Sequence, residues 1–407
     1  MKVFLKGCIA SVLIGALLIF FFGAGFVAHG VFSGAMNRTA ETASVEEISA
    51  VATPPDNFNV FYEALGMLRN EFYGELPEGQ QVPYAAIRGV LARLEDPNTV
   101  LVEPVAHERE REQFQGEFGG IGAQVSMNEE GQIVIVSPIP DTPASSAGLR
   151  PNDVILEVDG TILTDMSLEE AVELIRGPVG TEVTLLIQRP DEDDSFSVTL
   201  TRDKIPDITV NYAMVEGTDI GYIHMSFFSA RTTEELRAAI ESLREEGARK
   251  FALDLRNNPG GLLDAAISTS SLFIGEGVIA YQQRNDGSRG ELTVEGRPIL
   301  PEVPLVVLIN EGTASASEIL AGALQAYERA TLVGTTSFGK GTVQIPYTLS
   351  DGSSLHVTVA HWLTPDGIDL SREGLMPGVY VETTEEQRQA GVDPVYEKAI
   401  ELLEEME

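Results

Sequence analysis

Between residues 219 and 334, short apolar strands alternate with amphipathic helices, and this alternation limits the fold more than any other feature of the sequence. The runs at 251–255 and 305–309 are continuously apolar, as expected for strands that are buried on both faces of a sheet. An amphipathic helix at 236–243 comes before the first run, and a helix begins near Ser315 after the second. The pattern predicts an α/β core.

Residues 115–200 follow a different pattern, in which short β-branched strands surround one helix. The helix begins with the capping box Ser167-x-x-Glu170. The glycine-rich segment 119–122 precedes a strand, whereas a dinucleotide site needs a glycine turn that opens a helix. The amides of a glycine loop can instead hold a peptide carboxylate while the peptide adds a strand beside the helix. A simple hairpin turn is the other interpretation.

This segment resembles a PDZ domain in the order of its motifs, which are Gly119-Gly120-Ile121-Gly122, Pro143-Ala144-Ser145-Ser146-Ala147-Gly148-Leu149, Pro151-Asn152-Asp153-Val154-Ile155 and Val158-Asp159-Gly160. The resemblance implies that a peptide carboxylate meets the amides of Gly120, Ile121 and Gly122. It also implies that Val172 and Ile175 lie near the last side chain of the peptide. Arg176 ends the helix, either as a cation favoured by the helix dipole or as a sensor of the ligand.

Charge is unevenly distributed along the chain, which holds 27 Lys and Arg against 62 Asp and Glu. The first 40 residues contain three bases and no acid, and they surround an uncharged apolar run at 7–27. A run of that length spans about 30 Å, enough for a single transmembrane helix, although a cleaved signal peptide is the alternative. Lys2 and Lys6 place the N-terminus in the cytoplasm by the positive-inside rule, which predicts a single-pass anchor in the cell inner membrane with everything after residue 30 extracytoplasmic, or periplasmic.

Several classes of function are excluded by composition and motif. The large acidic excess argues against nucleic acid as a partner, because phosphate binding needs clustered bases. Cys8 is the only cysteine, so the exported part has no disulfide, no thiol nucleophile and no thiolate metal site. No H-E-x-x-H motif occurs, and the sequence predicts neither a metal nor a cofactor.

The segment 334–341 matches G-x-x-x-x-G-K, yet Gly341 stands where a P-loop needs Ser or Thr for magnesium. It also leads into a strand, whereas a P-loop opens a helix. ATP binding is therefore not predicted. Lys340 remains either a solvated turn residue or a group with another task.

Two turns could together form a hydrolytic site. Ser315-x-x-Glu318 is a capping box, but a serine at a strand-to-helix turn is also placed so that helix amides stabilise an oxyanion. The turn Asn258-Pro259-Gly260-Gly261 follows a buried strand and could supply a second amide. The general base stays open at this point between His224, His361 and Lys340, because lysine can act as a base when burial favours its neutral form.

From residue 58 to about 380 the chain resembles a carboxyl-terminal processing peptidase of the S41 type. The segments that carry the likeness are 87–97, Gly221-Tyr222-Ile223, Leu253-Asp254-Leu255-Arg256-Asn257-Asn258-Pro259-Gly260-Gly261, Ser315-Ala316-Ser317-Glu318-Ile319 and Phe338-Gly339-Lys340-Gly341-Thr342-Val343-Gln344.

The resemblance implies that Ser315 is the nucleophile, that Lys340 is the base and that Gln344 orients it. It places the oxyanion hole at the amide of Ala316 and at Gly260 or Gly261, without deciding between the two glycines. Ser317 would not be the nucleophile. Three positions depart from the pattern without touching this set: Asn98, Ala326 and the pair Pro377-Gly378.

The expected fold class is an α/β protease core, ClpP/crotonase-like, with an inserted PDZ domain, an N-terminal helical segment and a single N-terminal transmembrane helix. The expected function is serine endopeptidase action on extracytoplasmic proteins with exposed, apolar C-termini or unstructured apolar segments. A catalytically inactive PDZ scaffold is the alternative.

Membrane contact is expected through residues 7–27, and the resemblance implies a homodimer or higher oligomer. The expected domains are 1–30 (cytoplasmic tip and anchor), 31–57 (linker), 58–114 (helical), 115–200 (PDZ), 201–383 (peptidase core) and 384–407 (C-terminal helix).

Overall fold

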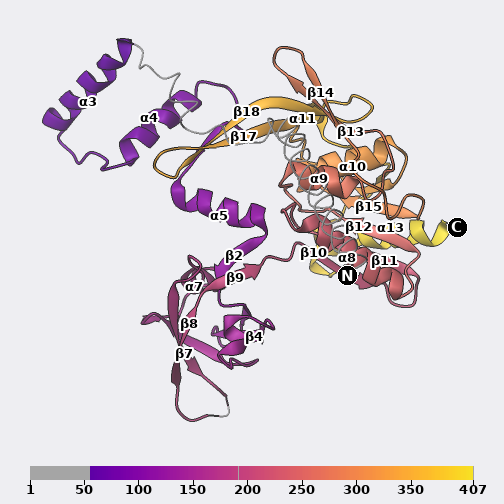
Figure 1. The fold of residues 1–407 in the computed structure, drawn as a ribbon, viewed down its shortest axis with the longest axis horizontal. Coiled ribbons are helices and arrows are strands. Elements are labelled where there is room, and N and C mark those ends of the chain that lie inside the picture. Colours follow the sequence, from indigo (N-terminus) through magenta and orange to yellow (C-terminus); the bar gives the residue numbers. More distant parts are fainter. Residues whose placement is uncertain (1–55, 191, 407) are drawn as a thin grey trace, which may run out of the picture. The chain divides into compact units, whose positions relative to one another are not determined.

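The computed structural model describes residues 56–190 and 192–406. These residues form two compact units, which we describe separately (Figure 1). The first unit contains residues 56–103 and 344–357. The second contains residues 104–343 and 358–406.

The first unit is helical at its start. Tyr84 is buried in the second long helix, and its hydroxyl donates a 2.7 Å hydrogen bond to Asp351. Hydrogen bonds from Ser353 and Tyr84 lower the pKa of Asp351 to about 2. A short strand then pairs antiparallel with the start of a later one, so that Val100 lies opposite His356. The elements are η2 (Asp56–Phe58), α3 (Asn59–Glu71), α4 (Gln81–Leu91), β1 (Val100–Val102), β17 (Thr342–Thr348) and β18 (Ser354–Leu363); the last two extend into the second unit.

The first part of the second unit is a six-stranded antiparallel sheet that packs against one helix. Its main path has the strand order β3-β4-β5-β7-β8, and a sixth short strand, β6, pairs with β5. This order leaves one edge of β3 unpaired, and α7 contacts this strand. The predicted capping box begins α7, because the Glu170 amide donates to the Ser167 hydroxyl and the Ser167 amide donates to the Glu170 carboxylate. The elements are α5 (Pro104–Gln115), β2 (Glu117–Gly120), β3 (Ala123–Met127), β4 (Ile133–Pro138), α6 (Pro143–Ser146), β5 (Val154–Val158), β6 (Thr161–Ile162), α7 (Leu168–Ile175), β7 (Glu182–Gln188), β8 (Phe196–Thr201) and β9 (Asp203–Pro206).

An ion pair joins Asp153, directly before β5, to Arg189, directly after β7. Asp153 is completely buried, and the Arg189 guanidinium donates two 2.8 Å hydrogen bonds to its carboxylate. Burial raises the pKa of Asp153, but hydrogen bonds from Arg189 and from the Arg150 amide outweigh it, so the net pKa is lowered. The ionised carboxylate is therefore the form that the fold stabilises.

Replacing Arg189 by alanine is expected to cost about 3 kcal/mol of stability, because an uncompensated charge is left buried. The effect should be present at neutral pH, and it should disappear as the pH falls below the ordinary Asp value of 3.8 toward the lower folded-state pKa. Hydrogen–deuterium exchange of β7 measures it. Arg109→Ala is the control, because Arg109 pairs with Glu173 at the surface and such pairs contribute about 1 kcal/mol or less. Equal exchange in both variants would contradict the prediction.

The second part of this unit is an α/β core built on a six-stranded sheet of order β10-β11-β12-β15-β16-β19. The strands from β11 onward are parallel, and β10 pairs antiparallel with β11. Helices α8, α9 and α10 bury their apolar side chains against one face of the sheet. The elements are β10 (Val210–Met214), β11 (Ile220–Met225), α8 (Thr232–Glu245), β12 (Lys250–Asp254), α9 (Leu263–Ser270), β13 (Val278–Arg284), β14 (Arg289–Thr293), β15 (Leu305–Ile309), α10 (Ala316–Ala326), β16 (Thr331–Gly334), α11 (Leu370–Glu373), β19 (Val379–Tyr380), α12 (Glu385–Gln389) and α13 (Pro394–Glu405).

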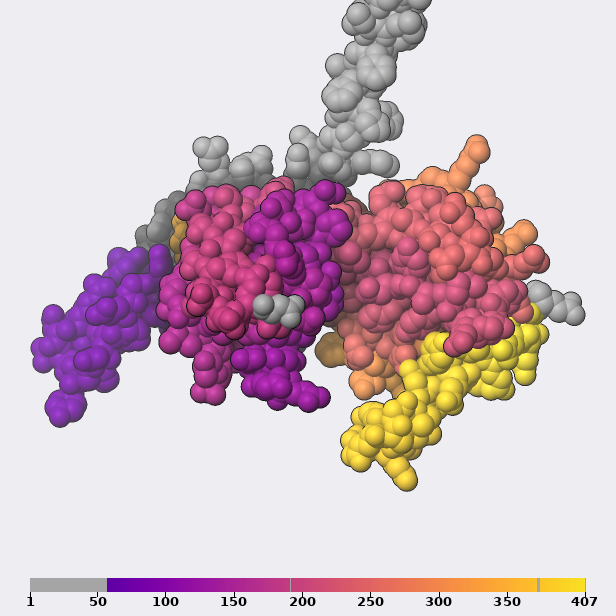
Figure 2. Space-filling model, turned by 90° about the horizontal axis from the view of Figure 1, so that it is seen from below, coloured from indigo at the N-terminus to yellow at the C-terminus, as the bar shows by residue number. Residues whose placement is uncertain are grey.

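The C-terminal helix α13 covers the opposite face of this sheet. Val395, Ala399 and Leu403 pack there against side chains from the parallel strands. The Lys250 ammonium donates a 2.9 Å hydrogen bond to the Leu403 carbonyl near the end of the helix, where cations are favoured. The C-terminal segment lies on the surface of the core (Figure 2, yellow). The strand and helix alternation predicted for this region is confirmed, whereas helix α9 and the β13–β14 hairpin had not been predicted.

The expected fold class needs one correction. In residues 56–190 and 192–406, no helix has the length and apolar character needed to cross a membrane. The apolar run at 7–27, on which the single transmembrane helix was predicted, lies outside the described residues. The described fold is an α/β core with a separate antiparallel sheet and an N-terminal helical segment, and the predicted transmembrane helix is not supported. The expected domain limits stay a prediction.

Candidate active site

Ser315 lies in the turn between β15 and α10, in a backbone conformation that is rare for serine. Its φ is 55°, although a helix N-cap residue normally adopts the β region. The Ser315 amide donates a 2.8 Å hydrogen bond to Oε2 of Glu318. This bond belongs to the predicted capping box, and it lies at a strained residue of the kind that is found at functional sites.

The Glu318 carboxylate joins this turn to the loop that carries Lys340. Its side chain is completely buried, and Oε1 accepts hydrogen bonds from the Ser337 hydroxyl at 2.5 Å and from the Gly339 amide at 2.7 Å. Oε2 accepts the Lys340 amide at 3.0 Å in addition to the Ser315 amide. Because both amides bond to one oxygen, their nitrogens lie within about 6 Å of each other.

The glycine after Lys340 has a steric explanation. A Cβ atom on Gly341 would lie 2.1 Å from the backbone nitrogen of Ser371. The segment then enters β17 rather than a helix, as predicted. Gly341 therefore allows close backbone packing, and the likeness to a P-loop has no structural basis.

The Gly260-Gly261 turn lies directly against Ser315. A Cβ atom on Gly260 would be 2.9 Å from both the Ser315 Cβ and the Ala316 amide nitrogen. One on Gly261 would be 2.2 Å from the Phe228 carbonyl oxygen. Both glycines have positive φ, 104° and 142°, so no other residue suits this approach.

The amides of this turn are not equally available. The Gly260 amide donates a 3.0 Å hydrogen bond to the side-chain oxygen of Asn258. Within the part of the chain that the structure describes, the amides of Gly261 and Ala316 have no hydrogen-bond acceptor. These two donors, next to Ser315, match what an oxyanion hole requires.

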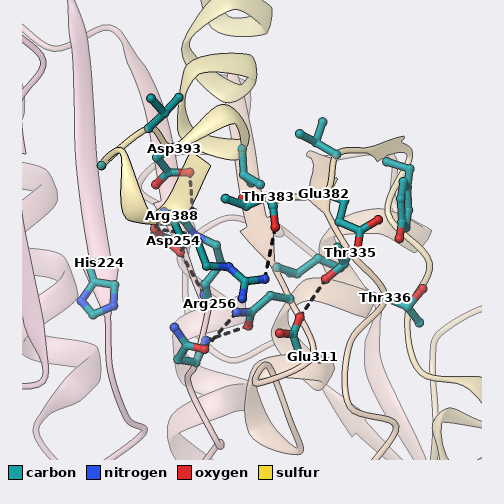
Figure 3. Close-up of a pocket in the computed structure, with 18 of the residues that line it drawn as sticks. His224, Asp254, Arg256, Glu311, Thr335, Thr336, Glu382, Thr383, Arg388 and Asp393 are labelled. Atoms are coloured by element: carbon teal, nitrogen blue, oxygen red, sulfur yellow. Dashed lines mark hydrogen bonds and ion pairs between the residues drawn. The ribbon is translucent and has the colours of Figure 1, made fainter. Parts of the chain in front are cut away.

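Of the two histidines that the sequence left open as bases, His224 lies on the face of the sheet away from this turn. His224 shares its face of β11 with Ile220 and Tyr222, which pack toward α13, whereas α10 packs on the other face. It lines a cavity of about 900 Å³ at the carboxyl end of the parallel strands (Figure 3). His361 is exposed on β18. Lys340 is the candidate base that the Glu318 contacts bring near Ser315.

The same cavity is crossed by an ion-pair chain. Arg256 pairs with Asp254 at 2.6 Å and with Asp393, at the start of α13, at 2.8 Å (Figure 3). Burial and the neighbouring Asp254 carboxylate raise the pKa of Tyr222, whose hydroxyl donates to Asp254. Each of the three guanidinium nitrogens of Arg256 donates to a carboxylate, so this cluster anchors the C-terminal helix.

Gln344 lies on β17, and its side chain was predicted to orient Lys340. In the first unit its side-chain amide donates a 3.2 Å hydrogen bond to the Asn98 carbonyl. Asn98 is one of the positions where the sequence departs from the family pattern. Groups that could hold a metal ion are absent from the described residues.

The predicted peptide-binding residues lie around the open edge of β3. Gly120 ends β2, and Ile121 and Gly122 form the loop into β3; all three are buried. Ile175 is buried and Val172 half-buried on α7. Arg176 is exposed, and its guanidinium lies 3.7 Å from the centre of the Phe118 ring, which is a contact that neither predicted role had foreseen.

Two residues of this site had no assigned role in the sequence: Glu318 and Asn258. The capping-box pattern in the sequence already linked Glu318 to Ser315, but no nearby residue pattern predicted its hydrogen bonds to the loop that carries Lys340. Asn258 was noted in the sequence only as part of the turn Asn258-Pro259-Gly260-Gly261, with no role of its own. Its contacts with distant backbone become visible only in the fold.

Comparison with known proteins identifies two families in this chain. The family model for peptidase family S41 matches residues 219–381, and the PDZ domain model matches residues 134–189. A carboxyl-terminal-processing protease of Synechocystis is 40% identical over 344 residues, which cover 83% of this chain and 80% of that protein. Carboxy-terminal processing protease CtpA of Bacillus subtilis is 38% identical over 335 residues, covering 82% and 71%.

Among solved structures, the photosystem II D1 C-terminal processing protease is 33% identical to this chain. It is similar over 77% of this chain and 86% of its own, with a TM-score of 0.46. Identity and coverage of the curated relatives are sufficient to assign the family. The chain belongs to the carboxyl-terminal processing proteases of peptidase family S41, which are serine endopeptidases, and it carries a PDZ domain.

Proposed function

We propose that the chain cleaves proteins with a Ser-Lys dyad formed by Ser315 and Lys340. The observation that carries the proposal is the single Glu318 oxygen that accepts the backbone amides of both residues. Neutral Lys340 takes the Ser315 proton, and the Ser315 oxygen attacks the substrate carbonyl carbon. Lys340 then returns the proton to the leaving amine, and water hydrolyses the acyl-enzyme.

The negative charge of the tetrahedral intermediate is held by the amides of Gly261 and Ala316. Gly261 is chosen over Gly260 because the Gly260 amide is already bonded to Asn258. Ala316 is the first residue of α10, where an amide has no acceptor within its helix and the helix dipole favours negative charge. Gln344, four residues after Lys340, is proposed to orient the lysine.

The substrate is proposed to be a protein with an exposed apolar C-terminus, which the PDZ domain binds as an added strand. The free edge of β3, with α7 beside it, supports this mode of binding. The amides of Gly120, Ile121 and Gly122 would bind the carboxylate, and Val172 and Ile175 would contact the last side chain.

We also propose that the protein acts outside the cytoplasm. The basic N-terminal residues beside an apolar run, and the lack of cysteine after Cys8, support that location.

The test is to incubate the chain with an unstructured polypeptide that ends in apolar residues, and to follow fragments by mass spectrometry. Cleavage is expected, and it should slow when the same polypeptide carries a C-terminal amide, because the PDZ loop then loses the carboxylate that it binds. An unchanged rate with the amide would contradict C-terminal recognition. Binding without any cleavage would favour the alternative function, a PDZ scaffold that presents C-termini to another protease.

A further inference from the structure

Asn258 joins three segments of the core next to the proposed oxyanion hole, two through its side chain and the third through its backbone carbonyl. It is completely buried. Its Nδ2 donates a 2.8 Å hydrogen bond to the carbonyl of Met225, the last residue of β11. Its Oδ1 accepts the Gly260 amide at 3.0 Å, which fixes the first glycine of the turn to the rigid end of the strand.

The backbone of the same residue binds the other wall of the site. The Asn258 carbonyl accepts the Ala314 amide at 3.0 Å and the Ser317 hydroxyl at 3.0 Å. These residues flank Ser315 and Ala316 on both sides. One buried residue therefore contacts both the Gly260-Gly261 turn and the nucleophile turn.

Only an asparagine-type side chain satisfies these partners. Met225 presents an acceptor and Gly260 presents a donor, so the side chain between them needs one donor group and one acceptor group at fixed spacing. An aspartate would place a second acceptor against the Met225 carbonyl. An alanine would leave both buried backbone groups without a partner, which costs free energy and releases the turn.

We infer that Asn258 is the positioning residue of the oxyanion hole: it occupies the Gly260 amide and holds the Gly261 amide beside that of Ala316. The inference rests on the proposed function of Ser315 as nucleophile. Asn258 acts through the two amides and does not contact the substrate. Its effect should therefore appear in the chemical step, since a displacement of about 1 Å in such a group can lower the rate about 100-fold.

The experiment compares Asn258→Ala and Asn258→Asp with Asn310→Ala. Asn310 is a matched control, because it also joins the two turns, accepting the Asn257 and Gly312 amides and donating to the Asn257 side chain, but outside the Gly260-Gly261 turn. Measured quantities are kcat and KM for a peptide substrate, the affinity for a peptide aldehyde that forms an oxyanion on serine, and the melting temperature.

For Asn258→Ala we expect kcat to fall about 10- to 100-fold with KM unchanged, and aldehyde affinity to fall by a similar factor. Asn258→Asp keeps the acceptor for the Gly260 amide, so kcat should fall less than in Asn258→Ala, while the carboxylate against the Met225 carbonyl should lower the melting temperature. Asn310→Ala should lower the melting temperature while kcat stays within about twofold of the parent. The inference is overturned if Asn258→Ala and Asn310→Ala lose kcat equally, or if KM rises while kcat is kept.

Failure of the inference can be told apart from failure of the proposed function. A parent chain that neither cleaves the peptide nor binds the aldehyde would overturn the proposed function. Hydrogen–deuterium exchange of the segment 255–262 would then still decide whether Asn258 holds the turn: faster exchange in Asn258→Ala than in Asn310→Ala supports it, and equal exchange overturns it. The Asn258→Asp variant keeps the comparison valid if Asn258→Ala does not fold.

Discussion

Replacing Ser315 by alanine should abolish peptide-bond cleavage, with a loss of about 10⁴-fold or more in kcat, because no other group can form the acyl-enzyme. Lys340→Ala should cost a similar factor, since the serine then has no base to take its proton. The effects should not add in the double variant, as is usual for residues that act as a unit. Cleavage of an unstructured polypeptide measures all three.

Ser317→Ala is the matched control for this prediction. Ser317 lies in the same turn, is completely buried and donates a hydrogen bond to the Asn258 carbonyl. Its loss should cost about 1 kcal/mol of stability and leave most of the activity. An inactive Ser317→Ala beside an active Ser315→Ala would show that the nucleophile is wrongly assigned. Equal cleavage by the parent, Ser315→Ala and Lys340→Ala would contradict the proposal of a Ser-Lys dyad.

Gly261→Ala is the prediction with the second largest effect. The added Cβ would lie 2.2 Å from the Phe228 oxygen and 2.8 Å from the Phe228 carbonyl carbon, and the residue would keep a φ of 142° that alanine rarely adopts. The turn must therefore shift, and the Gly261 amide moves away from the oxyanion. We expect kcat to fall about 10²- to 10³-fold, as when one oxyanion donor is removed.

A second glycine separates this effect from backbone strain alone. Gly287 also has a positive φ, 81°, and a Cβ there would meet nothing within 4 Å. Gly287→Ala should lower stability slightly and leave kcat unchanged. If Gly261→Ala keeps the parental kcat while its melting temperature falls like that of Gly287→Ala, the turn is not part of the oxyanion hole.

Local pattern was sufficient for much of the fold. The apolar runs that became β12 and β15, the capping box of α7 and the strand after Lys340 were predicted, because burial and capping depend on residues a few positions apart. The β13–β14 hairpin was missed: its seven- and five-residue strands contain Gln, Arg and Glu, so that apolar alternation is weak. Helix α9 was missed because it follows the glycine turn directly.

The sequence by itself determined which residue types are available for chemistry: the serine turn at 315, the glycine turn at 260–261, a lysine between two glycines, and neither a cysteine after Cys8 nor an H-E-x-x-H motif. Tertiary structure alone decided how they combine. The Glu318 carboxylate joins Ser315 and Lys340, which lie 25 positions apart, Asn258 occupies the Gly260 amide, and His224 lies on the face of the sheet away from α10. These relations are hydrogen bonds and side-chain directions between segments distant in the chain. They depend on packed three-dimensional geometry, which no local spacing encodes.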